Sequence, residues 1–125
     1  MLLNHVGIIN ESEDKAVMFY HDLLRFEKTR EFIVSPKLSE QLFSILQEIK
    51  VLVFERDGIK LEVFICLECK RSFPDYSHIG LLLDDFDVIK DKAQQMGVLI
   101  VGKTDEKTVY FLKDFSGNLI EIKPK

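Results

Sequence analysis

The sequence predicts an α+β protein built from two copies of a module that runs strand, helix and three strands. Two repeated patterns predict this arrangement. Asn-His-Val-Gly-Ile at 4–8 corresponds to Ser-His-Ile-Gly-Leu at 77–81, and the stretch 58–62 corresponds to 117–121, each ending in Glu. We therefore expect one module at about 1–66 and a second at about 75–125, together forming a single domain of 125 residues.

Composition and charge are those of an ordinary globular protein. Hydrophobic residues make up 46% of the sequence and charged residues 30%, and no apolar run reaches the ~20 residues of a membrane-spanning helix. The 17 basic residues are scattered among 21 acidic ones, so no nucleic-acid-binding face is indicated. No charged-then-apolar targeting pattern opens the sequence, and a cytoplasmic location is expected.

The elements of the first module follow from hydrophobic spacing. A strand is expected from Leu2 to Ile9, with apolar residues on both faces. A capped helix follows, with an apolar stripe at Ala16, Phe19, Tyr20, Leu23 and Leu24. Strands are expected at 26–34, 51–55 and 59–65, the last two joined by Asp57-Gly58, which favours a two-residue hairpin turn. An additional amphipathic helix is expected over 36–49, opened by Pro36.

The second module repeats this order after a polar connection over 66–75. A strand is expected at 76–83, followed by a helix that Asp85 caps and Gly97 ends. Strands follow at 98–101 and 108–112. The closing stretch 111–122 is typical of strand, turn and strand, with the turn at Gly117-Asn118.

The two cysteines, Cys66 and Cys69, have the C-x-x-C spacing of a redox pair or of half a zinc site. A zinc site needs a second ligand pair nearby, and the sequence has none. Because a cytoplasmic chain keeps its thiols reduced, we expect two free thiols without a function.

Two glutamates interrupt apolar strands. Glu62 lies within 59–65, and Glu121 lies between Ile120 and Ile122. Each module therefore carries one histidine on its first strand and one glutamate on its last, and pairing of the modules would bring two imidazoles and two carboxylates into one cleft. Such a set of nitrogen and oxygen ligands suits Zn(II), Ni(II), Co(II), Mn(II) or Fe(II). The metal prediction depends on the whole set, because a lone histidine on a strand is usually structural.

These patterns together resemble the vicinal oxygen chelate superfamily, which includes glyoxalase I, methylmalonyl-CoA epimerase, extradiol dioxygenases, and fosfomycin and bleomycin resistance proteins. The resemblance covers nearly the whole chain and implies two βαβββ modules that form a cupped mixed sheet around a central cleft. It is carried by His5 in Leu-Asn-His-Val-Gly, the Phe19-Tyr20 helix, His78 in Ser-His-Ile-Gly, and the closing Asp114-x-x-Gly117-Asn118-x-x-Glu121.

By position, the resemblance makes four residues the metal ligands of a glyoxalase-like or epimerase-like site: His5, Glu62, His78 and Glu121. Glutamate at 62 favours the glyoxalase type, because the epimerases more often resemble a pattern with Gln there and the extradiol dioxygenases use no carboxylate at that position. Two other positions depart from the family pattern, since Arg25 stands where Gly is common and Phe115 where Pro is usual.

The chemistry that the resemblance implies is proton transfer at a carbon next to a carbonyl. A divalent ion would chelate two neighbouring oxygens of a small carbonyl or thioester substrate and stabilise the enediolate, with Glu62 or Glu121 as the base. Two alternatives stay open. One is epimerase-like isomerisation of an acyl-CoA, which a basic cluster would favour. The other is a metal-free module of the same fold that sequesters a small molecule, against which the two carboxylates argue.

Other features have several interpretations. The 36–49 helix would act as a lid over the site or pack on a second chain, and since members of the superfamily often pair, a homodimer is expected. Phe64, Leu82 and Phe111 are expected to pack in the core rather than line a substrate cavity. His21 falls outside the apolar stripe of its helix and is expected to face solvent.

Overall fold

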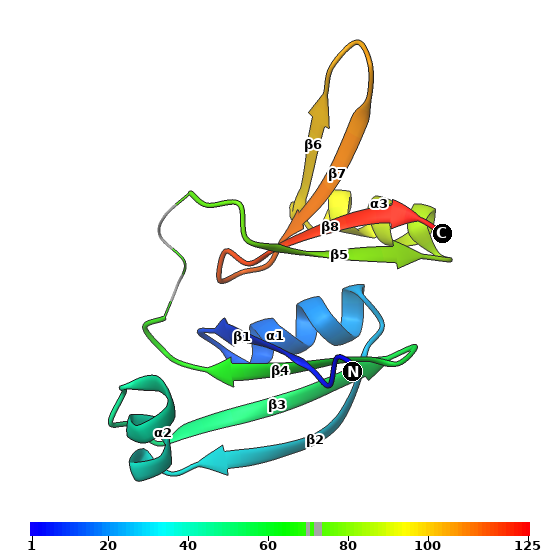
Figure 1. The fold of residues 1–125 in the computed structure, drawn as a ribbon. Helices are drawn as coiled ribbons and strands as arrows, with labels where there is room; N and C mark the ends of the chain where they lie inside the picture. The colour runs from blue at the N-terminus through cyan, green and yellow to red at the C-terminus, as the bar shows by residue number, and fades with distance from the viewer. Residues whose placement is uncertain (70, 72–73) are drawn as a thin grey trace. The chain divides into compact units, whose positions relative to one another are not determined.

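In the part of the chain that the computed structural model describes, residues 1–69, 71 and 74–125, there are two four-stranded mixed sheets, and a helix packs on one face of each (Figure 1). The chain divides into two compact units, Met1–Lys70 and Arg71–Lys125, with one sheet in each. The predicted α+β class and the repeat of strand, helix and three strands are confirmed.

The first unit has the sheet order β1-β4-β3-β2, in which β1 and β4 are parallel and the other neighbours are antiparallel. The first and last strands of the module are therefore hydrogen-bonded neighbours. The elements are β1 Val6–Asn10, α1 Glu13–Ala16, η1 Val17–Leu23, β2 Glu27–Val34, α2 Pro36–Phe43, β3 Ile49–Arg56 and β4 Ile59–Ile65.

The second unit repeats this topology as β5-β8-β7-β6, again with its first and last strands, β5 and β8, in parallel. The β6–β7 hairpin extends beyond the rest of its sheet (Figure 1). The elements are β5 His78–Leu83, α3 Phe86–Gln95, β6 Leu99–Lys103, β7 Thr108–Lys113 and β8 Leu119–Pro124.

The helix of the first unit packs through the predicted apolar stripe, but its geometry differs from the expected single α-helix. Ser12 caps α1 by accepting a hydrogen bond from the Lys15 backbone N–H, and the chain then widens into the π-helix η1. The stripe residues are fully buried, and the Tyr20 ring lies 5.8 Å from the Phe54 ring of β3. η1 ends at Leu23, and two residues later Arg25 adopts a left-handed conformation with φ of 62°.

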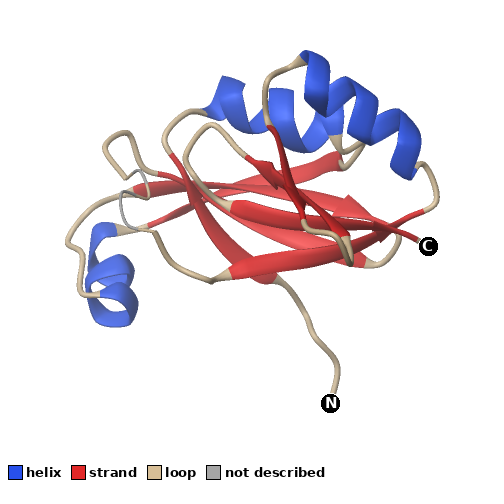
Figure 2. Cartoon of the chain, turned by 90° about the horizontal axis from the view of Figure 1, so that it is seen from above, coloured by secondary structure: helices blue, strands red, loops and turns tan. Residues whose placement is uncertain are grey.

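The first strand is shorter than predicted. β1 begins at Val6, not Leu2, and the residues before it form an extended segment that leaves the sheet (Figure 2). Leu2 and Leu3 are 94% and 81% exposed. Pairing with β4 begins at Val6↔Leu61, close to the start of β4 at Ile59, so little of the partner strand remains for the earlier residues.

The additional helix is also shorter than the predicted 36–49. α2 is capped by Ser35, which accepts from the Leu38 N–H, and has proline in its first turn as expected. It ends at Phe43 because Ser44 adopts a left-handed conformation, with φ of 61°. Ile49, predicted as part of the helical stripe, is the first residue of β3.

Glycine-containing turns form where the sequence predicts them. Asp57 and Gly58 both have positive φ, 50° and 81°, and connect β3 to β4 as a two-residue hairpin turn. Gly97, with φ of 73°, follows Met96, the C-cap residue of α3. The buried residues of α3 include Phe86, whose ring lies 5.5 Å from that of Tyr110 on β7.

Candidate functional site

The sheet face opposite η1 in the first unit, and opposite α3 in the second, carries one histidine and one glutamate. Ile120 and Ile122 of β8 are buried on the side of α3, and side chains alternate along a strand, so Glu121 lies on the other face. β4 repeats this arrangement, with Glu62 between two buried neighbours. The alternation explains why two glutamates interrupt otherwise apolar strands.

A glycine lies beside each glutamate in the parallel register. Gly7 pairs with Glu62, and Gly80 pairs with Glu121. A Cβ atom on Gly80 would lie in ordinary van der Waals contact with Glu121 Oε2, at 4.0 Å, so the carboxylate lies next to β5 at this glycine. The sequence prediction used these glycines only as markers of the repeat. Each glycine lies two residues after a histidine, and this spacing is the sequence signal for its place beside the glutamate.

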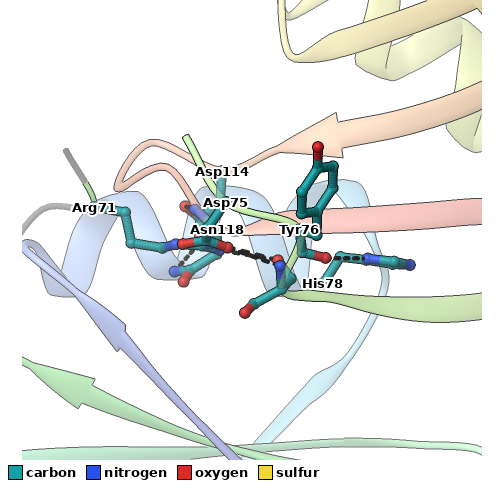
Figure 3. A network of polar contacts seen from close by, with 7 residues as sticks. Arg71, Asp75, Tyr76, His78, Asp114 and Asn118 are labelled. Carbon is teal, nitrogen blue, oxygen red and sulfur yellow. Dashed lines mark hydrogen bonds and ion pairs between the residues drawn. The ribbon is translucent and has the colours of Figure 1, made fainter. Parts of the chain in front are cut away.

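The second unit brings His78 and Glu121 together. His78 Nε2 lies 3.6 Å from Glu121 Oε2, and His78 Nδ1 lies 2.7 Å from the Tyr76 carbonyl oxygen (Figure 3). Because a carbonyl only accepts, Nδ1 carries the hydrogen, and in the neutral ring Nε2 keeps its lone pair. The nitrogen that can bind a cation is therefore the one that faces the carboxylate.

A polar network fixes the segment that leads into β5 (Figure 3). The Arg71 guanidinium pairs with the Asp75 carboxylate and donates to the Ser77 carbonyl at 3.3 Å. Asp75 Oδ1 also accepts from the Ser77 N–H at 2.7 Å. The hydrogen bond from Arg71, followed by that from the Ser77 backbone, lowers the pKa of Asp75 below its ordinary value. The network holds Ser77, the residue directly before His78.

The turn between β7 and β8 is organised by a buried carboxylate. Asp114 Oδ1 accepts from the backbone N–H groups of Ser116 and Asn118 at 2.9 and 2.8 Å, and Oδ2 accepts from Asn118 Nδ2 at 2.9 Å. Gly117 has φ of 90°, and a Cβ there would lie 3.1 Å from the Arg71 carbonyl oxygen. The family motif around Asp114 thus sets the start of the strand that carries Glu121.

The Lys123 ammonium also lies beside Glu121. Lys123, on the same face of β8, places Nζ 3.2 Å from Glu121 Oε1. Each carboxylate oxygen of Glu121 is therefore matched with one cationic or potentially cationic group. The Phe111 ring lies 5.1 Å from the His78 ring in an edge-on arrangement, next to the pair.

The first unit also brings His5 and Glu62 together, but through the other ring nitrogen. His5 Nδ1 lies 3.2 Å from Glu62 Oε2 and 2.7 Å from Asn4 Oδ1, so one ring N–H faces two acceptors. Nε2 has no polar partner within the described residues. His5 stands just before β1, and the second nitrogen is the one available to a ligand.

The four predicted ligands thus occur as two pairs, one in each unit. Within the described residues, no group of three or more His, Cys, Asp or Glu side chains is gathered as a metal-binding cluster. Each pair supplies an imidazole and a carboxylate, the ligand types of a mixed nitrogen and oxygen metal site, but only in the His78 pair does the unprotonated ring nitrogen face the carboxylate. The His78 ring fits best, since its other nitrogen is held by a backbone carbonyl.

Other residues singled out in the sequence have varied environments. Leu82 is 66% exposed, so the expectation of core packing is wrong for it. Phe64 and Phe111 are only partly buried, and Phe64 contacts Phe43 of α2 at 5.6 Å between ring centroids. His21 is exposed as expected, with Nδ1 donating to the Phe26 carbonyl at 2.7 Å.

The expectation of free thiols differs from the structure, which joins Cys66 and Cys69 in a disulfide. Cys66 directly follows β4, and its backbone N–H donates to the Asn10 carbonyl at 2.8 Å. The Cys69 N–H donates to the Cys66 carbonyl at 3.0 Å, which closes a turn and brings the two Cα atoms to 5.2 Å. The C-x-x-C spacing is evident from the sequence, whereas the turn that brings the two residues together is not.

Fold and sequence agree on one family. The chain belongs to the Glyoxalase/Bleomycin resistance protein/Dioxygenase superfamily, whose pattern it matches over residues 2–122, and the predicted resemblance to vicinal oxygen chelate proteins is confirmed. No curated protein has a sequence that matches this chain.

Solved structures of the same fold include fosfomycin resistance proteins. FosX from Mesorhizobium loti is 15% identical, with a TM-score of 0.72 over 99% of this chain and 91% of its own. FosX from Listeria monocytogenes in complex with Mn(II) and sulfate is 17% identical, with a TM-score of 0.71 over 99% and 92%. A glyoxalase family protein from Enterococcus faecalis is 21% identical, with a TM-score of 0.68 over 97% and 95%. At these identities the likeness establishes the fold. None of the helices in the described part of the chain is long and apolar enough to cross a membrane.

Proposed function

We propose that this chain is a divalent-metal-dependent lyase or isomerase of the glyoxalase I type, which moves a proton at a carbon next to a carbonyl. The observation that carries the proposal is the His78–Glu121 pair. His78 donates Nδ1–H to the Tyr76 carbonyl, as metal-binding histidines commonly do with the nitrogen that does not bind the metal, and its Nε2 lies near the Glu121 carboxylate. The Mn(II) in the Listeria FosX complex supports a divalent ion in a protein of this fold.

The proposed ligand set is the one the sequence predicts: His5, Glu62, His78 and Glu121. Pairing of the two modules, within one chain or between the two copies of a homodimer, would bring the pairs onto one ion. The metal is one of Ni(II), Co(II), Zn(II), Mn(II) or Fe(II), since all accept mixed nitrogen and oxygen ligands.

The bound ion would supply positive charge to two neighbouring oxygens of the substrate. The chain itself supplies the base, and Glu62 is the first candidate. Among the described residues only its Oε2 has a polar partner, His5, whereas both oxygens of Glu121 face a partner, His78 or Lys123. A carboxylate oxygen without a partner is free to take a proton. Glu121 then acts mainly as a ligand.

The substrate class is a small molecule with two adjacent oxygens, such as the hemithioacetal of an α-ketoaldehyde, or a carbonyl thioester. The edge of Phe111 beside His78 offers an apolar contact for the part of the substrate next to those oxygens.

Metal binding is the first test. Purified protein stripped with a chelator is titrated with Mn(II), Ni(II) and Zn(II) by calorimetry, alongside Glu121→Gln and His78→Ala. Each variant is expected to bind at least ~100-fold more weakly, because loss of a ligand exceeds loss of its outer hydrogen bond. Matched controls are Glu106→Gln and His21→Ala, which should bind as the unchanged protein does. Equal binding in all five proteins would contradict the proposal.

Turnover assays distinguish the glyoxalase I type from the epimerase and from the metal-free binding module. The metal-loaded protein is assayed with the hemithioacetal of methylglyoxal and glutathione, and with methylmalonyl-CoA. Isomerisation of the first that is lost in Glu62→Gln, assayed at a metal concentration that saturates this variant, supports the proposal. Activity on methylmalonyl-CoA alone would favour the epimerase, and tight binding of small carbonyl compounds without metal would favour a binding module.

A mixing experiment decides where the two pairs meet. His5→Ala and His78→Ala are purified separately, then combined under conditions that exchange subunits. If the site forms between chains, mixed dimers have one intact site and recover about a quarter of the sites of the unchanged protein. If the site forms within one chain, no metal binding returns. Light scattering on the same samples tests the proposed homodimer.

A further inference from the structure

We infer that Cys66 and Cys69 form a reversible thiol–disulfide exchange site that responds to the low-molecular-weight thiol couple, here glutathione. The inference is independent of the proposed metal chemistry. It rests on the bonded pair, on the hydrogen bonds that hold its backbone, and on the unequal exposure of the two sulfurs.

Backbone hydrogen bonds hold the two residues in place whether or not the sulfurs are joined. The Cys66 N–H donates to the carbonyl of Asn10, which is buried in the sheet, so Cys66 continues the pairing of β1 with β4. The Cys69 N–H donates back to the Cys66 carbonyl. Because the backbone already keeps the Cα atoms at 5.2 Å, the disulfide can open and close again without displacing β4.

The two sulfurs differ in access. Cys66 is 8% exposed, whereas Cys69 is partly exposed and follows the exposed pair Leu67 and Glu68. An incoming thiolate therefore attacks Cys69 Sγ, and Cys66 is the leaving thiolate, which takes a proton. A second glutathione thiolate then attacks the mixed disulfide at the glutathione sulfur. The net reaction converts the protein disulfide and two glutathiones into two protein thiols and glutathione disulfide, with two electrons and two protons transferred.

The short loop favours a reversible role over a structural one. Cys66 and Cys69 are separated by three positions, so the bond closes a small loop and removes little chain entropy from the unfolded state. The pair also lies at the end of the first compact unit, just before the boundary with the second. Opening the pair leaves the turn 66–69 held by its backbone hydrogen bond alone.

Thiol labelling tests the inference on the full-length protein. Samples equilibrated with glutathione at different ratios of reduced to oxidised form are quenched with N-ethylmaleimide and weighed by intact mass spectrometry. We expect the number of labelled thiols to fall from two to zero in one transition as the oxidised fraction rises, with the protein staying free of intermolecular disulfides. Thiols that stay labelled in pure oxidised glutathione, a pair that stays closed in pure reduced glutathione, or disulfide-linked dimers would each overturn it.

Two single variants test the order of attack. In folded Cys66→Ser, the remaining Cys69 is expected to label at least ten-fold faster than Cys66 does in folded Cys69→Ser. Equal rates would contradict the assignment of Cys69 as the attacked sulfur. Limited proteolysis adds a readout without mutation, since cleavage at the exposed Leu67 is expected to be faster in the reduced protein than in the oxidised one.

Discussion

Replacement of Asp114 by alanine is expected to destabilise the second unit strongly. The Asp114 carboxylate, 4% exposed, accepts two backbone hydrogen bonds and one from the side chain of Asn118. Asp114→Ala leaves the Ser116 and Asn118 N–H groups without this acceptor in a buried turn. At about 1–3 kcal/mol for each of these two unsatisfied groups, the loss is about 2–6 kcal/mol of unfolding free energy.

Asparagine at the same position is the matched control. Asp114→Asn keeps an oxygen for the two backbone groups but loses the charge and places its own NH₂ against Asn118 Nδ2. We expect a smaller loss of about 1–2 kcal/mol, since one hydrogen bond is removed and the others become neutral. Asn118→Ala, alone and combined with Asp114→Asn, isolates the side-chain contact as a double-mutant cycle.

Urea unfolding measures these differences. The chain has no tryptophan, so far-ultraviolet circular dichroism is the suitable signal. An alanine variant within 1 kcal/mol of the unchanged protein, or an asparagine variant as unstable as alanine, would refute the view that this carboxylate holds the turn.

Three further predictions follow from single residues. Arg25→Gly should raise the unfolding free energy by about 0.5–1 kcal/mol, because glycine tolerates φ of 62°, while Arg25→Ala should give no gain; equal effects in thermal unfolding would contradict this. Lys123→Met should tighten Mn(II) binding about two- to five-fold in calorimetry, because the ammonium competes for Glu121; weaker binding would count against it. Asp75 has a lowered pKa, so its ion pair with Arg71 stabilises the fold above the ordinary aspartate pKa of about 3.9 and loses this effect as pH falls through the lower folded value. Asp75→Asn should therefore flatten the fall of unfolding free energy with acid, and an unchanged slope in urea titrations would argue against it.

The sequence was sufficient for the repeated topology and for one histidine and one glutamate at equivalent strand positions of each module. Both depend on local spacing, because the repeated His-x-Gly motif and the alternation around each glutamate lie within single strands. That each histidine lies beside the glutamate of its own unit follows from the parallel pairing of β1 with β4 and of β5 with β8, which the sequence did not predict. The turn residues were equally local, since Asp57 and Gly58 determine the hairpin by their own backbone preferences.

Element ends were less predictable, because they depend on partners distant in sequence. Leu2 and Leu3 are apolar enough for a strand, but they lie before the first paired residue of β1, where β4 has not yet begun and offers no partner. Ile45 and Ile49 continue the helical spacing after α2. Ser44 nevertheless adopts a left-handed conformation that ends the helix, and Ile49 is the first residue of β3. Whether all four proposed ligands meet stays a prediction, because strand patterns describe each module and not the pairing of modules.

The parallel pairing of the first and last strands has a consequence for folding order. In the second unit, β5 and β8 are the most distant strands along the chain, yet the His78–Glu121 pair needs both. Contacts between distant segments require closure of the longest loop and tend to form late. A metal ion would then bind the His78–Glu121 pair only once the module is almost completely folded. Added metal should accordingly slow unfolding while leaving the refolding rate almost unchanged, so that its stabilising effect is mainly kinetic protection of the finished fold.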